Sequence, residues 1–273
     1  MPIRLDSSLI EGAPVRPLLV LISLALLVSV ASAQDSFEIE VYGSETLPKG
    51  ETAVELHSNF NVEAEDSSFP GVYPSQHSLN ESVEISHGFR DWLQGSFYVL
   101  TSINTAYGWQ WVGDRVRPQI RIPEAWHWPL GLSVSAEVGY QRPRFSPDTW
   151  TIELLPIVDK KIARWYFAFN PTLDRALHGP SVSKGFEFSP NVKVSYDIFR
   201  HAALGLEYYG SYGPIGSFDP LQTQQHQLVP SLELDLPHKW ELDVGYAFGL
   251  TRGTREQVLK VIVGRRFGGK HHP

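Results

Sequence analysis

Histidine and serine are residue types that could do acid–base or nucleophilic chemistry here, whereas a cysteine-based site is excluded because the sequence contains no cysteine. The 10 histidines are scattered, with neither an HExxH motif nor a close triplet of ligands. Residues 179–185 form a glycine-rich stretch that lacks the GxSxG elbow of a serine hydrolase. Adjacent His271 and His272 offer only adventitious metal binding. We therefore predict no catalytic residues, no metal site and no cofactor, and a protein that is not an enzyme.

Charged residues are the other candidates, because rows of charge can guide polar solutes through a narrow space. Arg115, Arg117 and Arg121 are all odd-numbered, so an extended strand places them on one face. Acidic residues crowd one face of the segments between 201 and 250 in the same way. The candidate selectivity residues are Arg115, Arg117, Arg121, Arg164, Glu137, Glu153, Glu207, Glu233, Asp235, Glu241 and Asp243.

Alternation of apolar and polar residues positions these side chains. In 132–141 the even positions read Leu, Val, Ala, Val, Tyr, and the odd positions read Ser, Ser, Glu, Gly, Gln. The run 240–250 repeats this pattern, and such runs reach the length of about 9–11 residues that a tilted strand needs to cross a bilayer. Twelve such segments are predicted at 51–63, 79–88, 92–104, 114–122, 131–142, 148–158, 163–173, 186–196, 201–210, 226–235, 239–250 and 256–267.

The links between these segments alternate in length, as in an up-and-down barrel with short periplasmic turns and longer external loops. The links 64–78, 105–113, 174–185 and 211–225 are long, and the link 251–255 is an exception. Tryptophans 92, 150 and 240 stand at segment starts, where interfacial aromatic girdles belong. We predict an all-β fold, a transmembrane up-and-down antiparallel β-barrel of about 12 strands. A soluble periplasmic β-sandwich is the alternative that shares the same alternation.

The N-terminus has the pattern of a cleaved signal peptide. Arg4 and Arg16 precede the apolar run 18–30, which ends at Ala31-Ser32-Ala33. The run is too short for a spanning helix, which needs about 20 residues. We expect residues 1–33 to direct export to the outer membrane and to be removed, so that outer-membrane lipid is a partner.

Residues 34–50 form a separate periplasmic N-terminal segment before the barrel over 51–267, and 268–273 form a flexible tail. Phe37, Ile39 and Val41 alternate with polar residues, but the run is too brief to span a bilayer. It either enters the lumen as a plug or pairs as a strand at the periplasmic rim. As a plug, it would favour gating or a structural role over open diffusion.

A proline recurs once per predicted hairpin, at Pro118, Pro156, Pro190 and Pro230, each in the pattern apolar-x-Pro-x-apolar-charged. Proline removes a ladder hydrogen bond and normally belongs on sheet edges, which a closed barrel lacks. β-Bulges at the prolines would reconcile the repeat with a barrel.

The last segment, 259–267, alternates and ends at Phe267. It resembles the C-terminal strand that the barrel-assembly machinery recognises in bacterial outer-membrane proteins, although Arg265 stands where an apolar residue is expected. We expect that machinery to be a partner during biogenesis.

The chain also resembles a known family over most of residues 36–267. The stretches FEIEVY (37–42), GETAVELH (50–57) and SVEISHGFRDW (82–92) and the proline strands look like the outer-membrane proteins of the phenol-degradation MetA-pathway family. The resemblance implies a porin-like barrel that helps small, often aromatic, compounds to cross the outer membrane. It carries no catalytic residues across.

These patterns leave two function classes for a membrane barrel. The first is a porin-like channel for passive or facilitated passage of small solutes through a charged lumen. The second is a non-conducting structural or ligand-binding barrel that acts through its external loops. Two hypotheses remain for the charged residues. Either they create an electric field across the lumen that orients polar solutes, or they pair with neighbouring charges and fill the interior. The net charge of −7 and the absence of a Lys/Arg-rich block argue against nucleic-acid binding.

Overall fold

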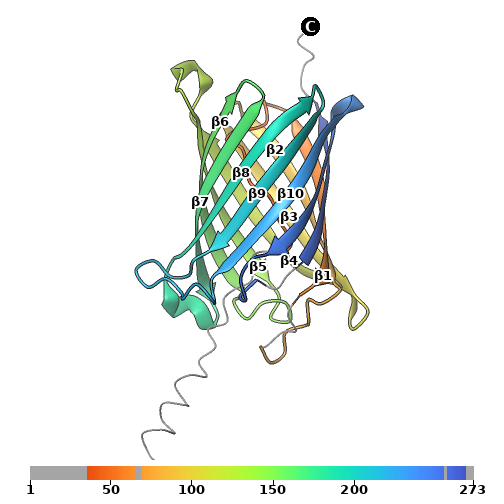
Figure 1. The fold of residues 1–273 in the computed structure, drawn as a ribbon, viewed down its shortest axis with the longest axis vertical. Helices are drawn as coiled ribbons and strands as arrows, with labels where there is room; N and C mark the ends of the chain where they lie inside the picture. The colour runs from red at the N-terminus through yellow and green to blue at the C-terminus, as the bar shows by residue number, and fades with distance from the viewer. Residues whose placement is uncertain (1–35, 65–68, 255–256, 269–273) are drawn as a thin grey trace, which may run out of the picture. The chain divides into compact units, whose positions relative to one another are not determined.

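The computed structural model describes residues 36–64, 69–254 and 257–268, so that the predicted signal peptide lies outside the described residues. Within these residues, twelve antiparallel strands form one closed barrel, because each strand pairs with its neighbours in sequence and the last pairs with the first. Figure 1 shows the strands tilted against the barrel axis. The strands are β1 (Thr52–Glu63), β2 (Leu79–Arg90), β3 (Leu93–Asn104), β4 (Gly108–Arg121), β5 (Gly131–Gln141), β6 (Trp150–Ile162), β7 (Trp165–His178), β8 (Glu187–Phe199), β9 (Ala202–Ser211), β10 (Gln225–Leu236), β11 (Trp240–Gly249) and β12 (Gln257–Phe267).

The prediction of a twelve-stranded up-and-down barrel is confirmed. The alternative of a soluble β-sandwich is wrong, because the sheet has no free edge: β1 pairs with both β2 and β12. The strands are 10 to 14 residues long, above the mode of about 5–6 residues in globular proteins.

Alternation along the strands sends apolar side chains outward and mostly polar side chains inward. On β5, Val134 and Val138 are exposed, whereas Ser135 and Glu137 are buried inside the barrel. This is the reverse of a soluble protein, which buries its apolar face. A continuous exposed apolar face of this kind marks a surface made for an apolar environment.

All eight tryptophans are exposed and lie near strand ends or in the links. We call the end of the barrel that carries the β1–β2, β3–β4, β5–β6, β7–β8, β9–β10 and β11–β12 links the loop end, and the opposite end the turn end. Trp109, Trp111 and Trp150 lie at the loop end; Trp92, Trp126, Trp128, Trp165 and Trp240 lie at the turn end. The two sets flank the apolar outer face, as two interfacial girdles do. Among the described residues, no helix is long and apolar enough to cross a membrane.

Two predicted links differ clearly from the structure. The long link expected over 174–185 spans residues 179–186, because β7 continues to His178, which pairs with Trp150 of β6. The long link expected over 105–113 is wrong, because β4 starts at Gly108 and pairs there with Asn104 of β3. Gly108 has a φ of +68°, a left-handed conformation that suits glycine and allows the chain to reverse within residues 105–107. Three of the links carry a short 3-10 helix: η1 (Glu124–Trp126), η2 (Pro180–Lys184) and η3 (Pro237–Lys239).

The strand prolines are accommodated without bulges. Proline lacks an N–H group, so it leaves out a ladder bond, but the register on both sides of Pro118, Pro156 and Pro230 is unshifted. The hypothesis of bulges at these positions is therefore wrong. The flanking pairs are Val116↔Val138 and Gln119↔Ser135, Leu154↔Leu173 and Val158↔Phe169, and Leu228↔Phe248 and Ser231↔Gly245.

Arg265, the unexpected cation near the end of the closing strand, is also accommodated. Its guanidinium lies 5.2 Å from the ring centre of Trp240 and 5.0 Å from that of Phe267. Cation–π contacts at a girdle allow a long basic side chain to lie on the outer face near the barrel rim.

Candidate functional site

The barrel interior is occupied by residues 36–47, which we call the lumenal segment. It starts near the loop end, where Ser36 accepts hydrogen bonds from Asn59 (3.1 Å) and Asn80 (2.8 Å). It ends near the turn end, where the Leu47 N–H donates to Gln94 Oε1 of β3 (2.8 Å). The segment therefore runs along the lumen before the chain turns into β1.

One side of the lumenal segment is apolar. Ile39 and Val41 are buried against a stripe of small and apolar side chains that point inward from five strands. Phe37 packs on a second apolar cluster toward the loop end, with Tyr98 and Leu100 of β3. The stripe beneath Ile39 and Val41 consists of Ala168, Tyr209, Val229, Ala247 and Val258.

The opposite side of the segment is acidic and faces the arginines of β4. Glu38 forms ion pairs with Arg117 (2.8 Å) and Arg115 (3.3 Å). Arg115 also pairs with Glu137 of β5 (3.4 Å), and Arg117 lies over the ring of Tyr42 at 3.9 Å. The alternation predicted for residues 37–42 thus matches an apolar stripe on one side and cations on the other.

Side-chain hydrogen bonds hold the second half of the segment. Asn170 of β7 accepts from the Tyr42 N–H (2.8 Å) and donates to the Tyr42 carbonyl (3.0 Å). Asp159 of β6 accepts from the Ser44 N–H (2.9 Å) and from the Ser44 hydroxyl (2.7 Å). These bonds satisfy backbone groups that would otherwise be buried without partners.

Gly88 of β2 makes room for the segment at the turn end. A Cβ at this position would lie 2.3 Å from the carbonyl oxygens of Leu47 and Pro48. Any larger residue would therefore push the chain away from the wall at the point where it enters β1.

A second charge network lies on the far wall of the lumen, on β8 to β12. Lys260, which is fully buried, pairs with Glu207 (2.8 Å) and Asp243 (2.9 Å). Lys193 pairs with Glu207 (3.3 Å) and Glu233 (3.0 Å). Three acidic residues of β9 to β11 are therefore paired with two lysines of the same wall.

Aromatic side chains gather at the loop end. Tyr73 of the β1–β2 link stacks on Tyr107 of the β3–β4 link, with ring centres 4.5 Å apart. Phe145 of the β5–β6 link meets both rings edge-on, and Arg144 lies over Tyr73 at 5.5 Å. Phe145 also packs against the apolar cluster that contains Phe37 of the lumenal segment.

The predicted selectivity residues are placed as follows. Most of them belong to the two networks, and Glu153 stands opposite Glu137 in the register. Arg164 does not face the lumen, because it lies in the two-residue turn between β6 and β7, where it is exposed and donates to the Ile198 carbonyl. Arg115, Arg117, Glu137 and Glu207 are buried, Arg121, Glu153, Glu233, Glu241 and Asp243 are partly exposed, and Asp235 is exposed.

Several residues that hold the segment are not among the predicted site residues. Glu38, Asp159 and Asn170 lie far in sequence from the residues that they bind, and the closed barrel brings each to its partner. The alternation of residues 37–42 was the sequence signal for Glu38. No motif marks Asp159 or Asn170.

The fold and its interior thus define a closed twelve-stranded barrel with an apolar outer face and a polar lumen that holds a segment of its own chain. No protein-family model matches the chain, and no curated protein matches it. The barrel is similar to the crystal structure of an outer-membrane channel from Pseudomonas putida F1, with a TM-score of 0.58 at 14% identity, covering 84% of this chain and 100% of that one.

Two solved porins are also similar. The KdgM porin, solved in complex with disordered oligogalacturonate, gives a TM-score of 0.52 at 10% identity and covers 79% of this chain and 99% of its own. The NanC porin gives 0.51 at 10% identity, covering 77% and 97%. At these identities the likeness concerns the fold.

Proposed function

We propose that this protein is a porin-like outer-membrane channel whose lumen is closed by the lumenal segment, residues 36–47. The observation that carries the proposal is the way in which the segment is held. The segment runs along the lumen and is held to the wall by side-chain hydrogen bonds, ion pairs and apolar contacts. Contacts of this kind can be released without unfolding the barrel.

The outer surface supports the membrane location. Apolar side chains cover the outward positions of the strands, and tryptophans stand at both ends. A barrel satisfies all its backbone groups within the sheet, as hydrocarbon requires. The similar solved structures are outer-membrane proteins, and we place this chain there by analogy of fold. The links of the loop end would then be external.

We propose small aromatic compounds as the solute class. The loop-end cluster of Tyr73, Tyr107 and Phe145 presents stacked rings where an external solute would arrive. The resemblance to the phenol-degradation MetA-pathway family points to the same class. The charges beyond the cluster favour solutes that carry a polar or ionised group.

Liposome swelling with a panel of solutes tests the proposal. The unmodified protein is compared with the double variant Glu38→Ala/Ser44→Ala, which removes the segment's ion pairs with β4 and one of its bonds to Asp159. We expect slow swelling for the unmodified protein and faster swelling for the variant, greatest with small aromatic acids. Equal swelling for an aromatic acid and a sugar of similar size would reject the solute class.

A second candidate function is a non-conducting structural or binding barrel. The observation in its favour is the extent of the segment, which contacts the wall at both ends and on both sides. If neither protein admits any solute, this second function is the better one.

A further inference from the structure

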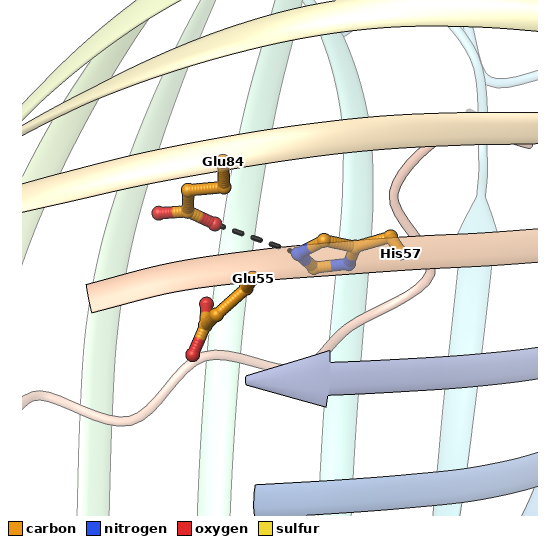
Figure 2. A group of neighbouring side chains, drawn as sticks. All are labelled: Glu55, His57 and Glu84. Atoms are coloured by element: carbon orange, nitrogen blue, oxygen red, sulfur yellow. Dashed lines mark ion pairs between the residues drawn. The ribbon is translucent and has the colours of Figure 1, made fainter. Parts of the chain in front are cut away.

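A histidine and two glutamates meet on the inner wall of the barrel. Glu55 and His57 project from β1 and Glu84 from β2 (Figure 2). One candidate ligand atom from each residue lies within 4.8 Å of those from the other two. The strand register pairs Glu55 directly with Glu84. All three side chains occupy inward-facing positions of two adjacent strands, which brings the group together.

His57 lacks the partners that a buried imidazole needs. It is fully buried, and neither ring nitrogen has a hydrogen-bond partner. Its Nε2 atom lies 3.5 Å from Glu84 Oε2, which also has no hydrogen-bond partner. Buried polar groups are normally satisfied, and a charge-assisted hydrogen bond would be about 2.7–2.9 Å long.

The spacing suits a metal ion between the two atoms. Ligand atoms that each lie about 2.0–2.2 Å from a tetrahedral zinc ion are about 3.4 Å apart. The other oxygen of Glu84 is already held, because it accepts from Ser86 Oγ (2.6 Å) and lies 3.5 Å from Arg117. Ligating carboxylates are commonly oriented by such outer contacts.

The lumenal segment supplies a further carboxylate. Glu40 carries an oxygen, Oε2, that is buried without a hydrogen-bond partner, and it lies close enough to His57 and Glu84 to interact with them electrostatically. If all three carboxylates are deprotonated, they outnumber the neighbouring Arg117, and a divalent cation would offset the excess negative charge. Imidazole and carboxylate together are the donors of zinc and related first-row transition metals.

We propose that Glu55, His57 and Glu84 form a binding site for a divalent transition-metal ion such as Zn²⁺. A metal ion there would bridge β1 and β2, and its charge would attract Glu40 of the lumenal segment. The proposal rests on side-chain geometry and does not depend on channel activity.

Zinc binding to the purified full-length protein tests the proposal. All samples carry His271→Gln and His272→Gln, which remove the adjacent tail histidines, and are stripped with EDTA before loading. Bound zinc is counted by elemental analysis, and affinity is measured by calorimetry. We expect one zinc ion per chain, at least tenfold weaker binding in His57→Gln and Glu55→Gln, and weaker binding in Glu40→Gln. His87→Gln, on β2 with the opposite parity to Glu84, is the matched control and should bind normally.

Two results would overturn the site. One is stoichiometric zinc binding that survives both His57→Gln and Glu55→Gln. The other is the absence of zinc binding to the parent protein, which carries only the two tail substitutions. Heat-modifiable gel mobility shows whether each variant has folded. Should the His57 variant fail to fold, cobalt substitution in the folded parent decides: an intense tetrahedral absorption spectrum supports the site, and the weak spectrum of hydrated cobalt rejects it.

Discussion

Asn170 of β7 binds the backbone of Tyr42 as a neighbouring strand would. Its side-chain amide accepts from the Tyr42 N–H at 2.8 Å and donates to the Tyr42 carbonyl at 3.0 Å. A single side chain therefore replaces the two ladder bonds that a strand would provide. The segment is held at this point without becoming part of the sheet, which is what a removable plug requires.

Replacing Asn170 should loosen the lumenal segment. Asn170→Ala removes two hydrogen bonds, each worth about 0.5–1.5 kcal/mol. If these bonds form only when the segment is docked, the ratio of open to closed channels should rise by roughly 5- to 150-fold. Single-channel recording in planar bilayers measures this ratio directly.

Asn104→Ala is the matched control for this experiment. Asn104 also faces the barrel interior, but its amide donates to the carbonyl of Gln76 in the β1–β2 link. The open fraction of the control should equal that of the unmodified protein. An Asn170→Ala channel that opens no more often than the control would show that the segment does not gate the pore.

Removing the charge of Lys260 should destabilise the barrel strongly. Lys260 is fully buried between Glu207 and Asp243, so Lys260→Met leaves Asp243 without this ion pair and Glu207 with Lys193 alone. Breaking a buried pair costs about 3–5 kcal/mol, and urea unfolding in detergent or lipid should register the loss. Lys161→Met, which breaks an exposed pair with Asp197, should cost about 1 kcal/mol or less. Equal losses in the two variants would contradict the prediction.

The barrel was predictable from the sequence because alternation is a local property. Most strand ends lie within a few residues of their expected places. The exceptions are the start of β4, where Gly108 reverses the chain early, and the end of β7, which continues to His178. The occupied lumen was not predictable in the same way. Tyr42 and Asn170 are 128 residues apart, and only closure of the barrel brings them together. Parity also placed Arg164 on an inner face, although it belongs to a turn where the strand pattern has ended.

The charge hypotheses for the lumen can be separated through Glu38. With the segment in place, Glu38 pairs with Arg115 and Arg117, so local pairing describes the closed state. The field across the lumen stays a prediction for the open state, in which Glu38 no longer pairs with these two arginines. Glu38→Gln removes the negative charge at nearly constant size and should shift the channel toward anions.

Reversal potentials under a salt gradient measure this shift in ion selectivity, with Asn170→Ala as the conducting background. Arg115→Ala/Arg117→Ala/Arg121→Ala should move the selectivity the other way, toward cations. Glu45→Gln, an exposed charge on the same segment, is the control and should leave the reversal potential unchanged. Unchanged selectivity in the arginine variant would end the field hypothesis.

A charged residue on the outer face should destabilise the barrel most at the middle of a strand. Leu206 is exposed near the middle of β9, whereas Leu236 is exposed at the last position of β10, at the turn end. In a membrane barrel an arginine costs about 2–4 kcal/mol at the bilayer midplane and about 0–1 kcal/mol near the interface. Leu206→Arg should therefore lower the free energy of unfolding from lipid vesicles by more than Leu236→Arg, as measured by urea titration. On a water-exposed barrel neither arginine would meet hydrocarbon, so equal and small effects would reject the membrane location.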